Sequence, residues 1–373
     1  MNKPVFLTLW LAAAAAAVLA QTAAAPVPDS PVVHSDRRVT FRFRAPGAKE
    51  VVLTREGGTR LPMQRDDVGV WSVTTESLPP DLYGYSFVAD GVALIDPANP
   101  LMKPNLLSTQ SMVHVPGAGM PWDIANVAHG AVHRHSYRSG VVGDDRDFYV
   151  YTPPGYDAKA KTLYPVLYLL HGFSDDARGW TDVGRAHVIL DNLIAQGKAK
   201  PMLMVMPLGY GAPEVVSRGP RDPGLRQKNM DKFREALLGE VIPAVERDYR
   251  ASKDRAQRAI AGLSMGGAET LYTGLNNPDR FAWIGSFSAG GVGEDFNASF
   301  PKLDAKVNDH LRLLWIACGT EDRLIDSNRK FKEWIKSKGV NFTPVETPGA
   351  HTWLVWRRNL AEFAPLLFAK KAS

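Results

Sequence analysis

A serine that could act as a nucleophile lies in the pentapeptide Gly262-Leu263-Ser264-Met265-Gly266, which has the pattern Gly-x-Ser-x-Gly. This pattern is typical of a nucleophile elbow, a sharp turn from a strand into a helix. The turn needs small residues two positions to either side of the serine, because the neighbouring chain comes too close for a Cβ. It would expose the Ser264 hydroxyl and aim helix N–H groups at an anion formed beside it. The sequence therefore predicts a nucleophilic Ser264; the alternative is a glycine-rich turn that contains a serine by chance.

A serine hydroxyl is a weak nucleophile until a histidine takes its proton. Two histidines follow Ser264 in the chain, His310 and His351. His310 precedes the predicted strand 311–317, so it is expected at the amino end of that strand, on the wrong side of the sheet. His351 follows the last predicted strand, 341–346, at its carboxyl end. His351 is therefore the predicted base.

The histidine in turn needs a carboxylate that fixes its tautomer and stabilises the imidazolium. Glu321 and Asp322 lie just past the carboxyl end of the predicted strand 311–317. The shorter side chain favours Asp322, with Glu321 as the alternative. Asp295 and Asp304 are weaker candidates because they follow the preceding strand.

The tetrahedral intermediate of acyl transfer needs two N–H groups aimed at its oxyanion. One is predicted to be the amide of Met265, the residue after the nucleophile. The second is expected from the loop after an earlier strand, and an apolar run ends in the His-Gly turn 171–172. The amide of Phe173 is therefore the predicted second donor. His171 itself is expected to make a structural polar contact.

The order of strand-like and helix-like segments changes near the Gly/Pro-rich stretch 115–121. Before it, short alternating segments separated by turn signals predict a small β-sandwich, whose aromatic residues are expected in its core. After it, strands alternate with helices, which predicts a mostly parallel sheet covered on both faces, with ligands at the carboxyl ends of the strands. The expected domains are an all-β module at 26–120 and a catalytic domain at 121–373.

The first 25 residues combine one lysine, an apolar block and small residues, which is typical of a cleaved signal peptide. The protein is therefore expected to be periplasmic or secreted, without membrane contact after cleavage. The single cysteine, Cys318, excludes a disulfide framework, and a net charge of +5 without long basic runs does not indicate nucleic acid. His129, His133 and His135 are expected to be structural, so neither a metal nor a cofactor is predicted.

The segments 151–156, 168–172, 262–267, 318–322 and 351–357 together carry a family resemblance. They resemble the esterase D-like α/β-hydrolases, which include feruloyl and acetylxylan esterases, enterochelin esterases and S-formylglutathione hydrolases. The resemblance supports Asp322 as the acid. It implies an α/β-hydrolase with a mostly parallel central sheet, preceded by a small all-β immunoglobulin-like sandwich. The expected exported two-domain layout and the carboxyl-terminal His-Thr-Trp-x-x-Trp-Arg segment look most like feruloyl esterases of polysaccharide degradation.

The expected substrate is a small ester or a feruloylated polysaccharide or oligosaccharide, which needs an apolar slot for the ring. A basic, loop-like segment at 217–228 keeps open an anionic ligand, such as the catecholate siderophore of an enterochelin-type esterase. A third reading is a polysaccharide-binding protein whose hydrolase domain is secondary or inactive. The aromatic residues predicted near strand ends, of which two or three are expected to touch substrate, are Phe173, Trp180, Tyr210, Phe287, Trp353 and Trp356.

Overall fold

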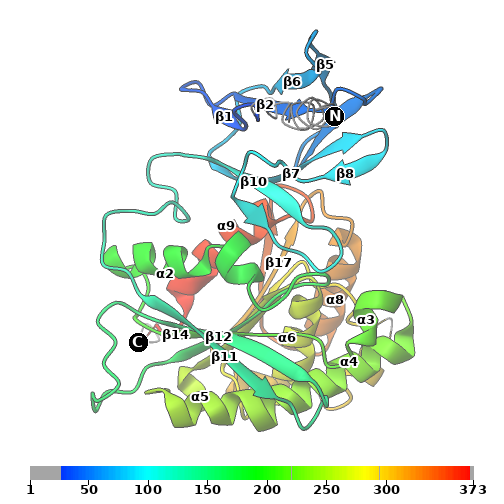
Figure 1. Ribbon diagram of the computed structural model, residues 1–373. Coiled ribbons are helices and arrows are strands. Elements are labelled where there is room, and N and C mark those ends of the chain that lie inside the picture. Colours follow the sequence, from blue (N-terminus) through cyan, green and yellow to red (C-terminus); the bar gives the residue numbers. More distant parts are fainter. Residues whose placement is uncertain (1–26, 220, 294, 370–373) are drawn as a thin grey trace, which may run out of the picture.

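The computed structural model describes residues 27–219, 221–293 and 295–369. The predicted signal peptide, 1–25, lies outside the described residues. The chain forms an all-β region followed by a larger region in which helices surround one sheet (Figure 1). Among the residues described, no helix is both long enough and apolar enough to cross a membrane.

The larger region is built on one eight-stranded sheet, in which a single strand, β12, runs against the others. The pairing is parallel from β14 through β13, β15, β16 and β17 to β18. Strand β12 pairs antiparallel with both β11 and β14. This confirms the predicted α/β-hydrolase class with a mostly parallel sheet. In spatial order the strands are β11 (Ala131–Arg138), β12 (Asp145–Thr152), β14 (Leu203–Pro207), β13 (Val166–Leu170), β15 (Arg258–Leu263), β16 (Trp283–Phe287), β17 (Leu313–Gly319) and β18 (Thr343–Thr347).

Every residue of the central strands β13, β14, β15 and β16 is buried, because helices cover both faces of the sheet (Figure 1). On one face α2 (Ala186–Ala195) and α9 (Trp353–Phe363) pack on the sheet. The helices on the opposite face are α4 (Pro223–Ala236), α5 (Ile242–Asp248), α6 (Met265–Asn276) and α8 (Ile325–Ser337).

The segment 217–228, predicted to be a loop, is partly helical. The short helix α3 (Glu214–Arg218) ends within it, and α4 begins at Pro223. Asp222 starts α4 by accepting hydrogen bonds from the amides of Gly224 and Leu225, and proline is well suited to the first helical position. The Asp-Pro pair was therefore the signal for a helix start at this position.

The all-β region, called the β-sandwich below, packs two sheets around one apolar core. Trp71, Tyr83 and Tyr85 lie in this core, as predicted. One sheet contains β1 (Val32–Val33), β2 (Val39–Arg44), β6 (Val70–Thr74) and β5 (Gln64–Arg65). The other contains β4 (Leu61–Pro62), β3 (Val51–Arg55), β7 (Asp81–Ala89), β10 (Gln110–Val115) and β9 (Met102–Lys103), with β8 (Val92–Leu94) paired to β7.

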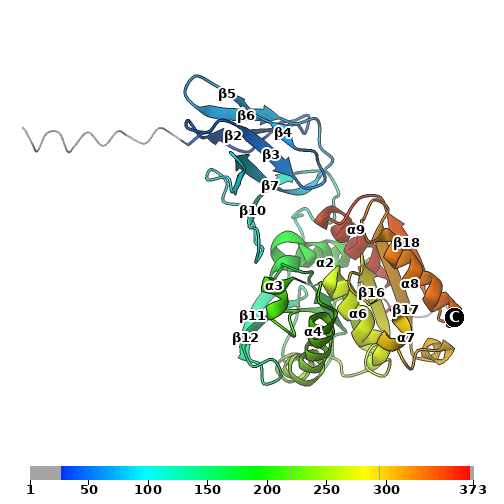
Figure 2. The same ribbon diagram turned by 90° about the vertical axis from the view of Figure 1, so that its right-hand side faces the viewer.

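The β-sandwich sits on the larger region beside α9, as both views show (Figures 1 and 2). Strand β7 contacts α9 directly. Helix α9 begins at Trp353, so its first turn follows closely after His351. The β-sandwich therefore rests against the segment that carries the predicted base.

Candidate active site

Ser264 occupies a tight turn between β15, which ends at Leu263, and α6, which begins at Met265. Its backbone is in the left-handed region, with φ of 52° and ψ of −113°, a conformation that non-glycine residues rarely adopt. The turn is held by its neighbours, because the Ser264 amide donates to the Phe287 carbonyl at 2.8 Å and the Gly290 amide donates to the Ser264 carbonyl at 3.0 Å. The strain is therefore fixed by the adjacent strand.

The two glycines of the pentapeptide lie where the backbone packs on itself. A Cβ on Gly262 would lie 2.5 Å from the Gly266 carbonyl oxygen, and a Cβ on Gly266 would lie 2.4 Å from the His171 carbonyl oxygen. Both distances are far below van der Waals contact, and the atoms they would meet are backbone. The physical reason given for small residues at these positions therefore applies to this turn.

His351 bridges Ser264 and Asp322. Its Nε2 lies 2.9 Å from Ser264 Oγ, and its Nδ1 lies 2.8 Å from Asp322 Oδ2. The Asp322 side chain is fully buried and also accepts a hydrogen bond from the Leu324 amide at 2.8 Å. Burial favours the neutral form of this carboxyl, but the hydrogen bond and charge of His351 outweigh it and hold the pKa of Asp322 below its usual value.

The alternative acid and the alternative base lie elsewhere. Glu321 is exposed to solvent, and its amide donates to the Gly349 carbonyl at 3.0 Å. His310 follows the short helix Ala305–Asp309 at the opposite end of β17, where its carbonyl accepts from Arg255. The arrangement thus places Asp322, and not Glu321, beside the imidazole.

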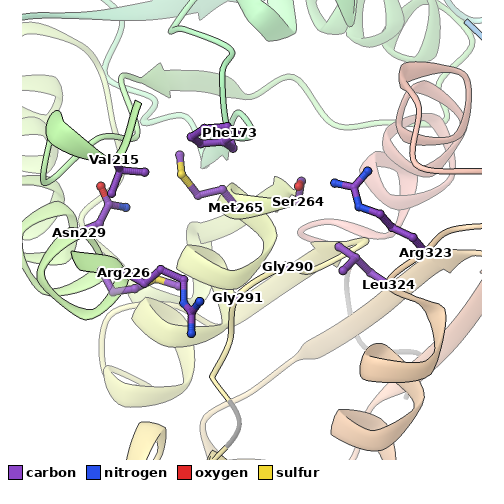
Figure 3. Close-up of a pocket in the computed structure, with 11 residues that line it drawn as sticks. Phe173, Val215, Arg226, Asn229, Ser264, Met265, Gly290, Gly291, Arg323 and Leu324 are labelled. Carbon is purple, nitrogen blue, oxygen red and sulfur yellow. The ribbon is translucent and has the colours of Figure 1, made fainter. Parts of the chain in front are cut away.

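The two residues predicted to supply the oxyanion donors line the same pocket as Ser264 (Figure 3). Met265 is the first residue of α6, so its N–H has no partner within the helix. Phe173 follows β13 in the loop that faces the serine turn, where a Cβ on Gly172 would lie 3.3 Å from Ser264 Cβ. The two amides therefore belong to loops that meet at the serine.

The pocket next to Ser264 has a volume of about 240 Å³ and is mainly apolar. Its apolar wall is lined by Phe173, Val215, Met230, Met265 and Leu324. Arg226, Arg323 and Asn229 add polar groups, and Arg323 extends toward Ser264 in Figure 3.

Five of the six aromatic residues expected near the substrate lie in the protein core, and only Phe173 reaches the pocket. Trp180 and Phe287 are fully buried, and Trp180 donates its indole N–H to the Leu170 carbonyl at 2.9 Å.

Trp353 and Trp356 belong to the inner face of α9, and the ring of Trp356 lies 4.8 Å from that of His351. Tyr210 belongs to a buried apolar cluster with Val215 and Met265, and its hydroxyl donates to the Asp175 carbonyl at 3.0 Å. The expectation that these five line the slot is therefore corrected: a position near a strand end does not determine which face of the sheet a side chain occupies.

Most of the pocket residues were not singled out from the sequence. Val215, Arg226, Asn229 and Met230 come from α3 and α4, and Leu324 precedes α8. The one available signal was the basic segment 217–228, which contains Arg226. Asn229 is held in place because its amide donates to Glu269 Oε1 at 2.8 Å and its oxygen accepts from the Ala212 amide at 3.1 Å.

The buried ring of His171 is held by two structural contacts. Its Nε2 accepts from the Gly209 amide at 2.8 Å, and its Nδ1 lies 2.8 Å from the Gly172 carbonyl. Burial lowers the pKa of His171 to about 4, so the ring is neutral near pH 7. The role expected for His171 agrees with these contacts.

The three histidines near the start of the larger region bind other side chains. His129, His133 and His135 contact Asp191, Thr152 and Tyr249, respectively. Within the described ranges, no group of three or more His, Cys, Asp or Glu side chains is arranged to hold a metal ion.

Comparison with known proteins places the chain in a family. Residues 139–367, well over half of the chain, match the family model described as "Putative esterase". An endo-1,4-beta-xylanase/feruloyl esterase of Xylanibacter ruminicola is 30% identical over 357 residues, which cover 92% of this chain and 46% of that protein. The chain thus spans about half the length of this relative.

Solved structures share the fold. A ferulic acid esterase is 27% identical, with a TM-score of 0.55 and coverage of 65% of this chain and 99% of that one. The enterobactin esterase FES from Shigella flexneri is 20% identical, with a TM-score of 0.68 over 89% of this chain and 93% of that one, so the likeness there concerns the fold alone. The chain belongs to this esterase family and has the α/β-hydrolase fold.

Proposed function

We propose that this protein is a serine carboxylic-ester hydrolase, with Ser264 as nucleophile, His351 as general base and Asp322 as the acid that orients the base. The observation that carries the proposal is the position of the His351 ring, with one nitrogen 2.9 Å from Ser264 Oγ and the other 2.8 Å from Asp322. These distances lie within hydrogen-bond reach on both sides of the imidazole.

The geometry supports a two-step acyl transfer. Asp322 accepts a hydrogen bond from the Nδ1–H of His351, which keeps the proton on Nδ1 and leaves the Nε2 lone pair facing Ser264. As Oγ attacks the ester carbonyl, its proton passes to Nε2, and the amides of Phe173 and Met265 stabilise the oxyanion. His351 then protonates the departing alcohol, which leaves an acyl-enzyme. Water, deprotonated by the same nitrogen, releases the acid and restores the serine.

The apolar pocket wall supports an acyl group with an aromatic ring or a small acyl group such as acetate. We infer that the natural substrate is a ferulic or related hydroxycinnamic ester, or an acetyl ester, on plant cell-wall polysaccharide. The names of the feruloyl esterase relatives support this choice. The proposal includes export by the predicted signal peptide, a periplasmic or secreted location, and the division into an amino-terminal module at 26–120 and a catalytic domain at 121–373.

A second candidate is hydrolysis of an anionic ester of the catecholate siderophore type. It is favoured by Arg226 and Arg323, two cationic side chains of the pocket, and no acidic side chain lines that pocket in the described part of the chain. The enterobactin esterase also shares the fold over nearly the whole chain, β-sandwich included. An anion that accepts from a guanidinium group gains charge-assisted hydrogen bonds.

The experiment that tests these candidates is a substrate panel of p-nitrophenyl acetate, methyl ferulate, acetylated xylan and enterobactin. We expect hydrolysis of p-nitrophenyl acetate and a higher kcat/KM for methyl ferulate than for enterobactin. A higher kcat/KM for enterobactin than for methyl ferulate would support the hypothesis of a siderophore esterase. No hydrolysis of any of the four by a folded protein would contradict the esterase proposal and support the polysaccharide-binding reading.

A further inference from the structure

The first turn of α9 is capped by a side chain from the β-sandwich. The Trp353 amide, the first of the helix, donates to Glu56 Oε1 at 2.8 Å. The residue in the capping position, Thr352, makes no side-chain capping bond of its own. An ionised carboxylate at this position satisfies a backbone N–H and interacts favourably with the helix dipole. Since His351 lies two residues before Trp353, Glu56 holds the segment that carries the predicted base.

Glu56 is itself fixed within the β-sandwich. Its Oε2 accepts from Lys103 Nζ at 2.9 Å and from the Gly84 amide at 3.3 Å, and its own amide donates to the Gly84 carbonyl at 2.8 Å. The side chains of Glu56 and Lys103 are only 8% and 13% exposed, so solvent screens their attraction weakly. The carboxylate is therefore a rigid support for α9.

One turn further along α9, Arg357 ties the helix to the same region. Its side chain is fully buried, and its Nε lies 2.9 Å from Asp81 Oδ1 while another guanidinium nitrogen donates to the Leu82 carbonyl at 2.6 Å. The third nitrogen donates to the Val183 carbonyl of the larger region at 2.9 Å. A buried guanidinium must keep its partners, because an uncompensated buried charge costs several kcal/mol. The orientation of α9 thus depends on strand β7.

The β-sandwich also contacts the loop of the second predicted oxyanion donor. The Asn105 amide group donates to Ser174 Oγ at 2.9 Å and to Asp175 Oδ1 at 3.1 Å. The Leu106 amide donates to the Ser174 carbonyl at 2.7 Å. Ser174 follows Phe173 and has a left-handed backbone, with φ of 69°. These bonds therefore hold a strained residue directly beside the predicted donor.

We infer that the β-sandwich is a positioning part of the active site, in which Glu56 places the His351 loop and Asn105 places the Phe173 loop. The inference rests on the proposed function, and it assigns no substrate contact to either residue. A displacement of about 1 Å at a reacting group costs on the order of a hundredfold in rate, so loosening either loop should be measurable.

The test compares single substitutions in the full-length chain with p-nitrophenyl acetate as substrate. Glu56→Ala should lower kcat roughly tenfold to a hundredfold with KM near that of the parent, because the loop of the base is loosened and the pocket is unchanged. Glu56→Gln keeps an oxygen acceptor for the Trp353 amide but weakens the pairing with Lys103. Glu56→Gln should therefore recover most of the lost kcat. Its melting temperature should fall below that of the parent, as should that of Glu56→Ala, because both variants weaken the pairing with Lys103.

The matched control is Glu50→Ala, because Glu50 is an exposed glutamate that precedes β3 while Glu56 follows it. It should leave kcat and melting temperature unchanged. Asn105→Ala should lower kcat independently of the Glu56 variants and tests the second loop even if Glu56→Ala folds poorly. An unchanged kcat in both Glu56→Ala and Asn105→Ala would overturn the inference, as would a Glu56→Gln variant as slow as Glu56→Ala.

Hydrogen–deuterium exchange of peptides covering 349–356 and 172–176 provides a readout that does not need turnover. We expect faster exchange of the first segment in Glu56→Ala and of the second in Asn105→Ala, with Glu50→Ala equal to the parent. A parent protein that hydrolyses no ester would contradict the proposed function alone. Unchanged exchange in both variants would contradict the positioning role whether or not the parent is active.

Discussion

The turn that carries Ser264 and the loop that carries His351 meet at one hydrogen bond but are held in different ways. The serine turn lies between two central strands, and its backbone bonds run to Phe287 and Gly290 of the adjacent strand and loop. The histidine loop follows β18, an edge strand whose one partner among the described strands is β17. It is held by the Glu321 amide, which donates to the Gly349 carbonyl, and by Glu56, which lies 297 residues before Trp353 and accepts from its amide. One segment is fixed within its own sheet, and the other is held by a separate region of the molecule as well.

Because of this difference, substitutions in the two halves of the site should lower activity in different ways. Substitutions at the serine turn should act through chemistry or local packing. Substitutions around the histidine loop should act through position, and should therefore respond to distant residues. The predictions below test the two halves in order of decreasing effect.

The largest effect is expected from Ser264→Ala, which removes the nucleophile. The rate with p-nitrophenyl acetate should fall on the order of 10⁶-fold, while the melting temperature should change little because the side chain contributes little packing. His351→Ala should be similarly slow, and the double variant no slower than either single one, since the members of such a set act as a unit. Turnover of Ser264→Ala within tenfold of the parent would remove it as the nucleophile.

The next effect is expected from Asp322→Asn. It keeps the side chain volume but presents an amide to Nδ1, so kcat should fall on the order of 10⁴-fold, by analogy with the serine proteases. Glu321→Gln is the matched control, because this neighbouring carboxylate is exposed and lies away from the imidazole, and it should be nearly silent. The opposite ranking in steady-state kinetics would transfer the acid role to Glu321.

A packing test of the serine turn is Gly266→Ala. The new Cβ would lie 2.4 Å from the His171 carbonyl oxygen, so either the turn or β13 must shift. We expect a loss of about 3 kcal/mol in the free energy of unfolding together with a large drop in kcat. Gly239→Ala is the control, since a Cβ at this exposed helical position meets no atom within 4 Å, and it should be neutral or slightly stabilising. Equal denaturation midpoints for the two variants would show that the turn tolerates a side chain.

The serine half of the site could be predicted from sequence because its constraints are local. A turn that excludes Cβ atoms leaves glycines at fixed spacing, and strand order places His351 and Asp322 at the same edge of the sheet. The fold class was predictable for the same reason, since strands buried on both faces are continuously apolar.

The pocket and the support of the histidine loop could not be predicted in the same way. Phe287 ends a strand at the correct edge, yet its ring faces the core beside Trp180, at a centroid distance of 6.3 Å. Glu56 stands in a Glu-Gly-Gly turn, which indicates only a change of chain direction. Its bond to the Trp353 amide depends on how two regions dock, and a single sequence contains no local pattern for that docking.

The smallest effect, and the one that tests the contact between the regions, is a change in the pH dependence of stability. Asp175 is 5% exposed beside Asn105, and burial raises its pKa to about 7, against the opposing influence of Lys103 and Asn105. Because the folded pKa lies above the ordinary value of 3.8, the contribution of the neutral carboxyl to stability is fully present only below pH 3.8. It decreases as the pH rises and is lost once the pH passes about 7.

Asp175→Asn keeps an acceptor for the Asn105 amide but cannot ionise. Its melting temperature should therefore exceed that of the parent by an amount that grows from pH 5 to pH 7 and then levels off, reaching several degrees. Asp67→Asn, at an exposed turn of the β-sandwich, is the control, and its melting temperature should differ from that of the parent by a constant amount over the same pH range. The measurement is thermal unfolding at constant ionic strength from pH 5 to pH 8.5. If the melting temperature of Asp175→Asn also differed from that of the parent by a constant amount, ionisation of Asp175 would not affect the contact with Asn105. The Phe173 loop would then be held there by the backbone bond of Leu106 and the Ser174 hydroxyl, rather than by the carboxyl.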